Sequence, residues 1–316
     1  MRHRPRGTVR TIDRDGAPAA ESSPPGRVVS GRRADTGKTI DLADLPPAEV
    51  VAAHLAPREP VPPLDAVTIR QWLWGRGFYL PGDARHVLDL VRPLALAPAM
   101  TLLDAAAGLG GPAWAIADEF GTTVSALERD HELTRRGETI ASGMAKPAGV
   151  KVFDPERFEL RAGAFDRVLA REATYMVDDK ERFLRVLSLA LRPDGRLLMT
   201  DFVIEPSNAE QPAQAAWAAL QPHRPRLWGL RQYSDCLRGL GLDLRAPEDM
   251  TAAYKAQILR GWDNLLQTVD LRSLPRAHRT AVVDEAERWM RTVAALDAGT
   301  LKFYRFTALA GSALRR

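Results

Sequence analysis

Residues 102–117 have the sequence LLDAAAGLGGPAWAIA, in which a short apolar run ends in an acid and a cluster of glycines follows. An apolar run, a glycine turn and a proline at the start of the next apolar segment together predict a strand, a tight turn and a helix. Glycine turns at the start of a helix commonly bind phosphate through backbone N–H groups. Asp104 lies at the mouth of this turn and would repel a phosphate, so we expect a ligand of another kind.

The segments around this stretch alternate between strand and helix patterns. The further expected strands are TVSALE (123–128), VKVF (150–153), FDRVLA (165–170) and RLLMTDFV (196–203). The expected helices include RHVLDLVRPLAL (85–96), HELTRRGETIASG (131–143) and DDKERFLRVLSLAL (178–191), the last with a capping box of Asp178 and Glu181. Such alternation predicts a parallel sheet with helices on both faces.

The C-terminal part breaks the alternation. Residues 252–296 are expected to be largely helical, and LKFYRFTALA (301–310) has the composition of a strand. The expected fold is therefore a Rossmann-like α/β fold. It has a seven-stranded, mostly parallel sheet, an antiparallel last strand, helices on both faces and a helical insertion before the last strand.

Composition divides the chain near residue 63. Residues 1–63 hold ten of the 23 prolines, and residues 1–33 carry eight Arg against three acids, a local charge of +5. The whole chain has a charge of +4, so the remainder is not a cationic nucleic-acid platform. We expect a disordered Pro/Arg-rich leader over 1–63, which could also contact RNA, acidic lipid or a protein.

Residues 64–316 are expected to form one domain. Its expected parts are a lid segment (67–83), a cofactor half (84–205), substrate-side helices (206–300) and the last strand (301–310). No run approaches 18 apolar residues, and the N-terminus lacks the apolar core of a secretory signal. The single cysteine, Cys236, excludes an internal disulfide, and no histidine cluster implies a metal. A cytoplasmic protein is expected.

Acidic residues follow three successive strands. Asp104 suits a cationic amine or ordered water, and Glu128, 18 residues after Gly110, can accept hydrogen bonds from both hydroxyls of a ribose. Asp154 follows the third strand, where it could meet an adenine edge. An adenosine ligand with an ammonium group and no diphosphate satisfies all three. S-adenosylmethionine is such a ligand.

At this point the chain resembles the class I S-adenosylmethionine-dependent methyltransferases over roughly residues 67–312. LLDAAAGLGG is similar to their first motif, ALERD (126–130) to their ribose motif, and RPDGRLLMTDF (192–202) to their fifth motif. KFYRFTALA (302–310) resembles their antiparallel seventh strand, which NAD dehydrogenases lack. Asp154 stands 11 residues before an FD pair, as the strand-three acid of the family does. We also expect cofactor contacts from Ala106, Gly108, Gly110, Arg129, Pro155 and Arg171.

The methyl acceptor is expected to be a small molecule. DNA amino-methyltransferases carry Asp or Asn, two prolines and an aromatic after strand four, where this chain has REATYM (171–176). Cytosine-carbon enzymes use a Pro-Cys nucleophile, whereas Cys236 follows Asp235. Nucleic acid is therefore not the expected acceptor, and the protein is expected to be a monomer or a homodimer.

Within the family, the chain resembles the phosphoethanolamine and sarcosine/dimethylglycine N-methyltransferases. WGRGFYLPGD (74–83) is similar to their lid, and LAREATYMVDDK (169–180) to their strand-four segment. The resemblance implies that Glu172 contacts a substrate amine. The catalytic His of that segment falls at Met176, and its tyrosine partner at Arg70.

Several further residues are candidates for the substrate pocket, each with a structural alternative. Trp74, Phe78 and Tyr79 could cover the sulfonium by cation–π contacts or pack a helix on the sheet edge. Tyr175 could orient the nucleophile or pack, and Asp201 could face the pocket or cap the next segment. Arginines that could bind an anionic substrate group, or lie solvated at the surface, are Arg224, Arg226 and Arg291.

The sequence favours methyl transfer to a small molecule with an amine nucleophile, with Glu172 and Tyr175 orienting the substrate. Two alternatives remain. Met176 in place of a catalytic His suggests a catalytically silent cofactor-binding regulator. An NAD-dependent oxidoreductase is disfavoured by Asp104 and by the terminal strand.

Overall fold

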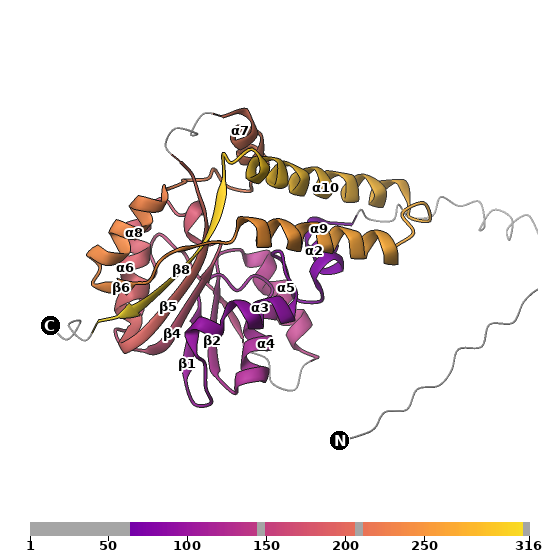
Figure 1. Ribbon diagram of the computed structural model, residues 1–316. Coiled ribbons are helices and arrows are strands. Elements are labelled where there is room, and N and C mark those ends of the chain that lie inside the picture. Colours follow the sequence, from indigo (N-terminus) through magenta and orange to yellow (C-terminus); the bar gives the residue numbers. More distant parts are fainter. Residues whose placement is uncertain (1–63, 144–148, 206–210, 312–316) are drawn as a thin grey trace, which may run out of the picture. The chain divides into compact units, whose positions relative to one another are not determined.

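A single β-sheet runs through the described part of the chain (Figure 1). The computed structural model describes residues 64–143, 149–205 and 211–311, all within the unit Glu59–Arg316. The expected leader, residues 1–63, lies outside the described residues. The strands are β1 (Thr101–Asp104), β2 (Thr123–Glu128), β3 (Val150–Val152), β4 (Phe165–Arg171), β5 (Leu191–Val203), β6 (Leu242–Leu244), β7 (Glu248–Asp249) and β8 (Lys302–Ala310).

The strand order is β3-β2-β1-β4-β5-β8-β6, with β7 paired to β8. Strands β1 to β5 pair in parallel, and β8 is antiparallel to β5, β6 and β7. The predicted fold class is confirmed, with the two-residue β7 as an addition to the seven expected strands. The chain moves outward from β1 to β3 and then returns to β4, so the order reverses between β1 and β4. Ligands bind at this kind of reversal in open α/β sheets.

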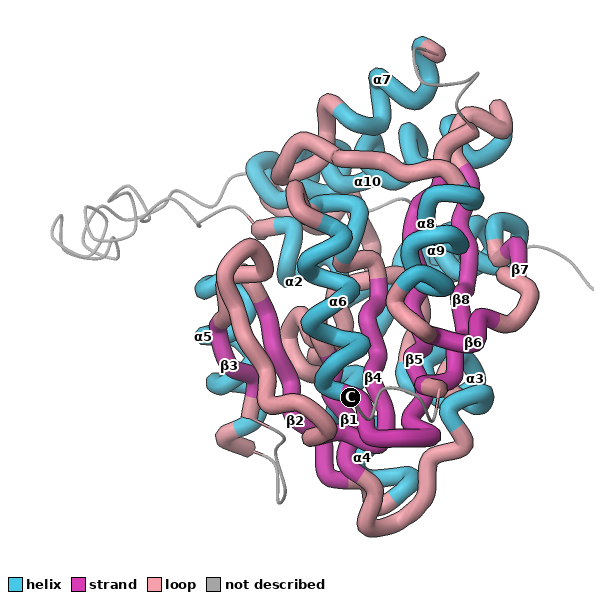
Figure 2. The backbone as a smooth tube through the Cα atoms, turned by 90° about the vertical axis from the view of Figure 1, so that its left-hand side faces the viewer, coloured by secondary structure: helices cyan, strands magenta, loops and turns pink. Residues whose placement is uncertain are grey.

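Helices cover both faces of the sheet. They are α2 (Ala66–Trp74), α3 (Ala84–Leu90), α4 (Gly111–Phe120), α5 (His131–Ala141), α6 (Lys180–Ala190), α7 (Pro212–Ala218), α8 (Leu230–Gly239), α9 (Thr251–Thr268) and α10 (Arg276–Asp297), with 3₁₀ turns η2 (Arg92–Leu94) and η3 (Thr174–Met176). Helices α6 and α8 lie on one side, and α2, α3 and α9 on the other (Figures 1 and 2). No helix in the described ranges is both long and apolar enough to cross a membrane.

Alternating side chains divide the interior into two cores. Leu102 of β1 belongs to the core under α2, α3 and α4, while its neighbour Leu103 belongs to the core under α6 and α8. In β5, Leu198 and Phe202 face the first core and Met199 the second. Successive residues of a strand point to opposite faces, so this two-residue period decides which side chains can reach any site on one face.

Two local predictions were wrong. The N-cap of α6 lies one residue later than expected, because Asp179, and not Asp178, accepts a hydrogen bond from the backbone N of Arg182 (2.9 Å). Asp178 forms an ion pair with Arg226 instead (2.7 Å). Strand β5 begins at Leu191 and not at the expected residue 196, and it pairs with β4 across a register shift that takes up the extra residues.

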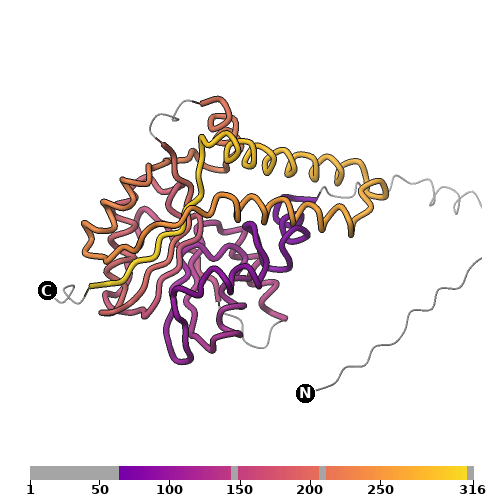
Figure 3. Tube along the Cα trace, viewed as in Figure 1, coloured from indigo at the N-terminus to yellow at the C-terminus, as the bar shows by residue number. Residues whose placement is uncertain are grey.

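The helical insertion packs against the N-terminal helix of the described chain. Helices α9 and α10 run side by side, with α2 beside them (Figure 3). The Trp74 and Trp289 rings meet edge to face with centroids 4.8 Å apart, which joins α2 to α10. Segments about 200 residues apart in the sequence therefore share one core.

The segment after α2 docks on the glycine turn. The backbone N of Gly111 donates to the carbonyl O of Gly77 (2.9 Å). A Cβ on Gly111 would overlap this carbonyl and lie 3.0 Å from the Phe78 ring. The close backbone approach explains why glycine stands at the first position of α4.

We expect Gly111→Ala to lower the free energy of unfolding by about 1–3 kcal/mol, because the added methyl group pushes the Gly77 segment off the turn. Differential scanning fluorimetry measures the shift. Gly239→Ala is the matched control, since a Cβ there meets nothing within 4 Å. Equal melting temperatures for the two variants would contradict the docking.

Candidate active site

A pocket opens at the carboxyl ends of β1, β2 and β4. It encloses about 750 Å³, its open mouth included. Its lining residues are Tyr79, Leu80, Ala105, Ala106, Gly108, Glu128, Arg129, Asp130, Leu133, Phe153, Pro155, Arg171, Glu172, Ala173, Met176, Val177, Phe183, Pro222 and His223.

The Glu128 carboxylate is held at the end of β2 by the backbone. Its Oε2 accepts from the N of Gly108 (2.8 Å), and its Oε1 accepts from the N of Asp130 (2.9 Å). Burial raises its pKa, and these backbone donors oppose the shift. Each carboxylate oxygen has capacity for a second hydrogen bond, so the group can receive two hydroxyls of a ligand while it fixes the turn.

Asp104 lies fully buried at the end of β1. Its Oδ1 accepts from the N of Ala106 (3.3 Å), and its Oδ2 has no hydrogen-bond partner among the described residues. Burial raises the pKa of Asp104 to about 6, and the nearby Arg171 opposes this. A buried acceptor without a partner is rare in proteins, and here it sits beside two residues that line the pocket, Ala105 and Ala106. It fits the donor of a ligand or an ordered water.

The structure brings most of the predicted cofactor residues to one pocket. Those that line it are Ala106, Gly108, Glu128, Arg129, Pro155 and Arg171. Gly110 does not line the pocket, and the Trp114 ring lies against it. Asp154 is exposed and lines a neighbouring hollow together with Arg129, Phe153 and Pro155.

A second cavity, of about 500 Å³, adjoins the first. The two share Tyr79, Leu80, Glu172, Met176 and Pro222. The other residues that line the second cavity are Arg70, Tyr175, Phe202, Trp217, Gln221, Tyr254, Arg288, Trp289 and Thr292. Its walls come from α2, η3, β5, α7, α9 and α10.

Glu172 occupies the boundary between the two cavities. It directly follows β4 with φ of +52°, a left-handed conformation that costs a non-glycine residue about 1–3 kcal/mol. Its backbone N donates to the O of Thr200 (2.7 Å), and Tyr254 Oη donates to its Oε2 (2.8 Å). Burial raises the pKa of Glu172 to about 7, so it can hold or release a proton near neutral pH.

Two of the other substrate candidates line the second cavity. The Tyr175 hydroxyl hydrogen-bonds Gln221 Oε1 (3.4 Å), and its ring packs edge-on against Phe202. Tyr79 lines both cavities. Trp74 and Phe78 instead belong to the core under α2. Their positions match the structural alternative given above, in which they pack a helix on the sheet.

The remaining candidates lie elsewhere. Asp201 is fully buried, but it follows the alternation of β5 and points to the α8 face, where Tyr233 Oη donates to it (3.2 Å). Its neighbour Phe202 takes the cavity side. Arg224 is exposed, and Arg291 is exposed and paired with Glu287 (3.2 Å). None of these three side chains lines either cavity.

Sequence reasoning did not select several lining residues. Arg70, Tyr254, Arg288 and Trp289 stand in amphipathic helices without a motif, and only the packing of α2 on α9 and α10 brings them together. His223 lies in the loop after α7 and lines the first pocket. The sequence signal that could have identified such a lining residue is a basic residue on the apolar face of a helix, as for Arg70 between Ile69 and Leu73.

Comparison with known proteins identifies the family. A family model described as a methyltransferase domain matches residues 79–246, more than half of the chain. The chain belongs to this family. The predicted class I methyltransferase fold and its cofactor, S-adenosylmethionine, are thereby confirmed, and the NAD-dependent alternative is excluded.

The methyltransferase is similar to phosphoethanolamine N-methyltransferase 2 of Caenorhabditis elegans, at 29% identity over 41% of this chain and 30% of that protein. It is 31% identical to sarcosine/dimethylglycine N-methyltransferase of Halorhodospira halochloris, over 49% of this chain and 56% of that protein. The chain thus spans about a third to just over half of these relatives.

Among solved structures, Haemonchus contortus phosphoethanolamine N-methyltransferase 2 in complex with S-adenosyl-L-methionine superposes with a TM-score of 0.64. It shares 21% sequence identity with this methyltransferase, and the match covers 78% of this chain and 57% of that chain. This likeness shows the common fold.

We expect Asp104→Asn to weaken S-adenosylmethionine binding about tenfold while it raises stability above pH 6. The raised pKa means that the native carboxyl loses its proton only near pH 6, so its ionisation costs stability as pH rises from 3.8 to about 6. The difference between these two pKa values limits this cost in stability to about 3 kcal/mol. Calorimetric titration and thermal unfolding at pH 8 measure both effects, with the exposed Asp118→Asn as control. A variant that loses stability and keeps its affinity would refute the assignment.

We expect Glu128→Gln to weaken S-adenosylmethionine binding at least tenfold, because a neutral amide cannot accept from ribose hydroxyls and from both backbone donors. Isothermal titration calorimetry checks this. Glu132→Gln, on the exposed side of α5, is the control. Unchanged affinity at position 128 would exclude a role for Glu128 at the ribose.

Proposed function

We propose that this protein transfers a methyl group from S-adenosylmethionine to a small-molecule acceptor in the second cavity. The observation that carries the proposal is the position of Glu172, whose side chain borders both the cofactor pocket and the neighbouring cavity. When bound, S-adenosylmethionine supplies an electrophilic methyl group on a sulfonium. An amine nucleophile is favoured, because the relatives named above are N-methyltransferases.

The acids at the three strand ends would each bind a different part of the cofactor. Asp104, with its unpartnered oxygen, suits the amino-acid end, and Glu128 suits the ribose. Asp154, at the rim beside Pro155, would meet the adenine. Further contacts would come from the turn and from two cations at the pocket, namely Ala106, Gly108, Gly110, Arg129 and Arg171.

Glu172 would orient the acceptor and accept its proton. Its ionised form is favoured above about pH 7, and Tyr254 holds one of its oxygens toward the cavity wall. The other oxygen can accept a hydrogen bond from an N–H or O–H group. Tyr175 and Tyr79 would close the sides of the cavity around the acceptor and exclude water from it.

A cofactor-binding regulator without turnover is the second candidate. Met176 stands at the boundary of the two cavities. The sequence resemblance described above implies a catalytic histidine at this position. A thioether cannot act as a base. The cytoplasmic location, the exclusion of nucleic acid as acceptor and the monomeric or homodimeric state stay predictions.

The test is turnover with a panel of amines, with S-adenosylhomocysteine as the measured product. We expect the rate to rise with pH through about 7, because Glu172 is protonated below its raised pKa and cannot accept a proton. Acceptors whose amine is already neutral throughout the pH range measured isolate this effect, because their nucleophilic fraction then does not change with pH. Glu172→Gln is expected to reduce turnover at least 100-fold with cofactor affinity within twofold of wild type.

Glu181→Gln, on the exposed side of α6, is the control. A Glu172→Gln variant with full turnover and an unchanged pH profile would disprove the role of Glu172. Cofactor binding without product from any acceptor would favour the regulator.

A further inference from the structure

We propose that the second cavity selects an acceptor with a planar, apolar body and an anionic group, the anion held by Arg70 and Arg288. This substrate class rests on the proposed function and extends it. Phosphoethanolamine and sarcosine, named in the relatives, have no such planar body.

Arg70 is a fixed, buried cation in the cavity wall. Arg70 is only 7% exposed, and its Nε donates a hydrogen bond to Glu285 Oε1 (2.5 Å). Its guanidinium carbon lies 4.2 Å from the centroid of the Tyr79 ring and 5.3 Å from that of Trp289. These contacts hold the guanidinium plane, and among the described residues its terminal nitrogens have no hydrogen-bond partner. They remain available to a ligand.

Arg288 supplies a second cation from α10, one turn after Glu285. Its Nε lies 3.4 Å from Glu285 Oε2, without hydrogen-bond geometry. Within the described residues, its Nε and Nη1 are both buried and unpartnered. Buried donors without acceptors cost about 1–3 kcal/mol each, so an acceptor arriving in the cavity relieves this cost.

The charge around the cavity is unbalanced in favour of an anion. A single carboxylate, Glu285, contacts both guanidinium groups. Trp289 Nε1 also donates to Glu285 (2.7 Å), which further spreads the negative charge. Glu172, the acid that lines the cavity itself, is close to half protonated at neutral pH because burial raises its pKa to about 7. Two arginines with one full counter-charge leave a net positive site.

Stability alone does not account for this cluster. Burying an ion costs several kcal/mol, and apolar side chains of similar size often stabilise a fold equally well. Arg70 stands where the helix pattern calls for an apolar residue, between Ile69 and Leu73, both in the core. Guanidinium groups are suited to carboxylates and phosphates through paired hydrogen bonds.

The rest of the cavity wall is aromatic. Phe202 lies at its centre, with ring centroids 5.2 Å from Tyr175, 5.1 Å from Trp217 and 5.6 Å from Tyr254. Aromatic walls favour a flat apolar ligand through ring packing. Glu172 borders the cofactor pocket, whereas Arg288 does not, so the acceptor would present its nucleophile at Glu172 and its anion toward the arginines.

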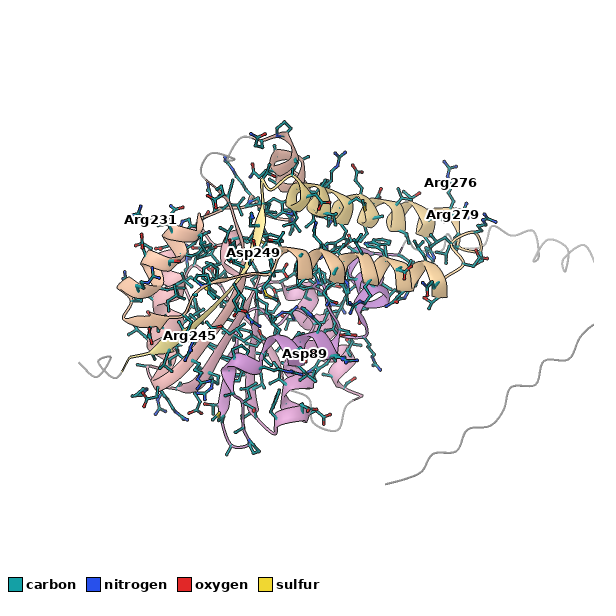
Figure 4. All side chains as sticks on the ribbon, viewed as in Figure 1. Asp89, Arg231, Arg245, Asp249, Arg276 and Arg279 are labelled. Carbon is teal, nitrogen blue, oxygen red and sulfur yellow. The ribbon has the colours of Figure 1, made fainter. Side chains whose placement is uncertain are left out.

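The experiment uses three probes on the full chain saturated with S-adenosylhomocysteine, namely anthranilate, phenyl phosphate and the neutral anthranilamide. Isothermal titration calorimetry is expected to show at least tenfold tighter binding of one or both anions than of the amide. Arg288→Met should abolish this preference, and Arg288→Lys should retain part of it. Arg276→Met is the matched control, because Arg276 is exposed at the far end of α10 (Figure 4).

Equal or tighter binding of anthranilamide, or no binding of any probe, overturns the inference. An anion preference that survives Arg288→Met also overturns it, because the anion would then bind elsewhere. Arg70→Lys, which keeps the charge beside Glu285, provides a second variant if Arg288→Met unfolds. Failure to bind S-adenosylhomocysteine itself, measured first, would instead overturn the proposed function.

Discussion

The hydrogen bond from Gly111 to Gly77 joins two parts of the chain that the site requires together. On one side lies the glycine turn, which presents its backbone to the Glu128 carboxylate. On the other lies the segment that follows α2 and carries Tyr79 into both cavities. Since the backbones touch at this point, the first pocket and the second cavity have a fixed relative position. A larger side chain at either glycine would separate them.

The three acids at the strand ends occupy different physical environments. Glu128 is buried and satisfied by backbone donors, Asp104 is buried with one oxygen unpartnered, and Asp154 is exposed at the rim. Burial without a partner is unfavourable in the protein alone, so the end of β1 gains most from a ligand donor. Glu172, which is buried, follows β4 and has a left-handed backbone, extends this pattern to the second cavity.

Sequence patterns predicted the elements well because strand and helix periods are local properties. They placed β1, the glycine turn and α4 together, and six of the nine predicted cofactor residues do line one pocket. Sequence patterns could not assign Asp201 to a face of the sheet. Alternate residues of β5 face opposite sides, but which set faces which side is known only from the pairing of β5 with β4. Arg70 and Arg288 depend on contacts between helices far apart in sequence, which no short motif records.

The wall of the second cavity is divided between separate stretches of chain. Residues 66–74 and 251–297 supply Arg70, Tyr254 and Arg288, while the glycine turn and the ends of β1 and β2 line only the first pocket. Because Trp74 packs on Trp289, neither stretch can be remodelled alone without loss of that contact. If evolution changes what the second cavity binds, substitutions in residues 66–74 and in residues 251–297 would therefore have to arise together. The part of the chain that forms the first pocket could be inherited unchanged.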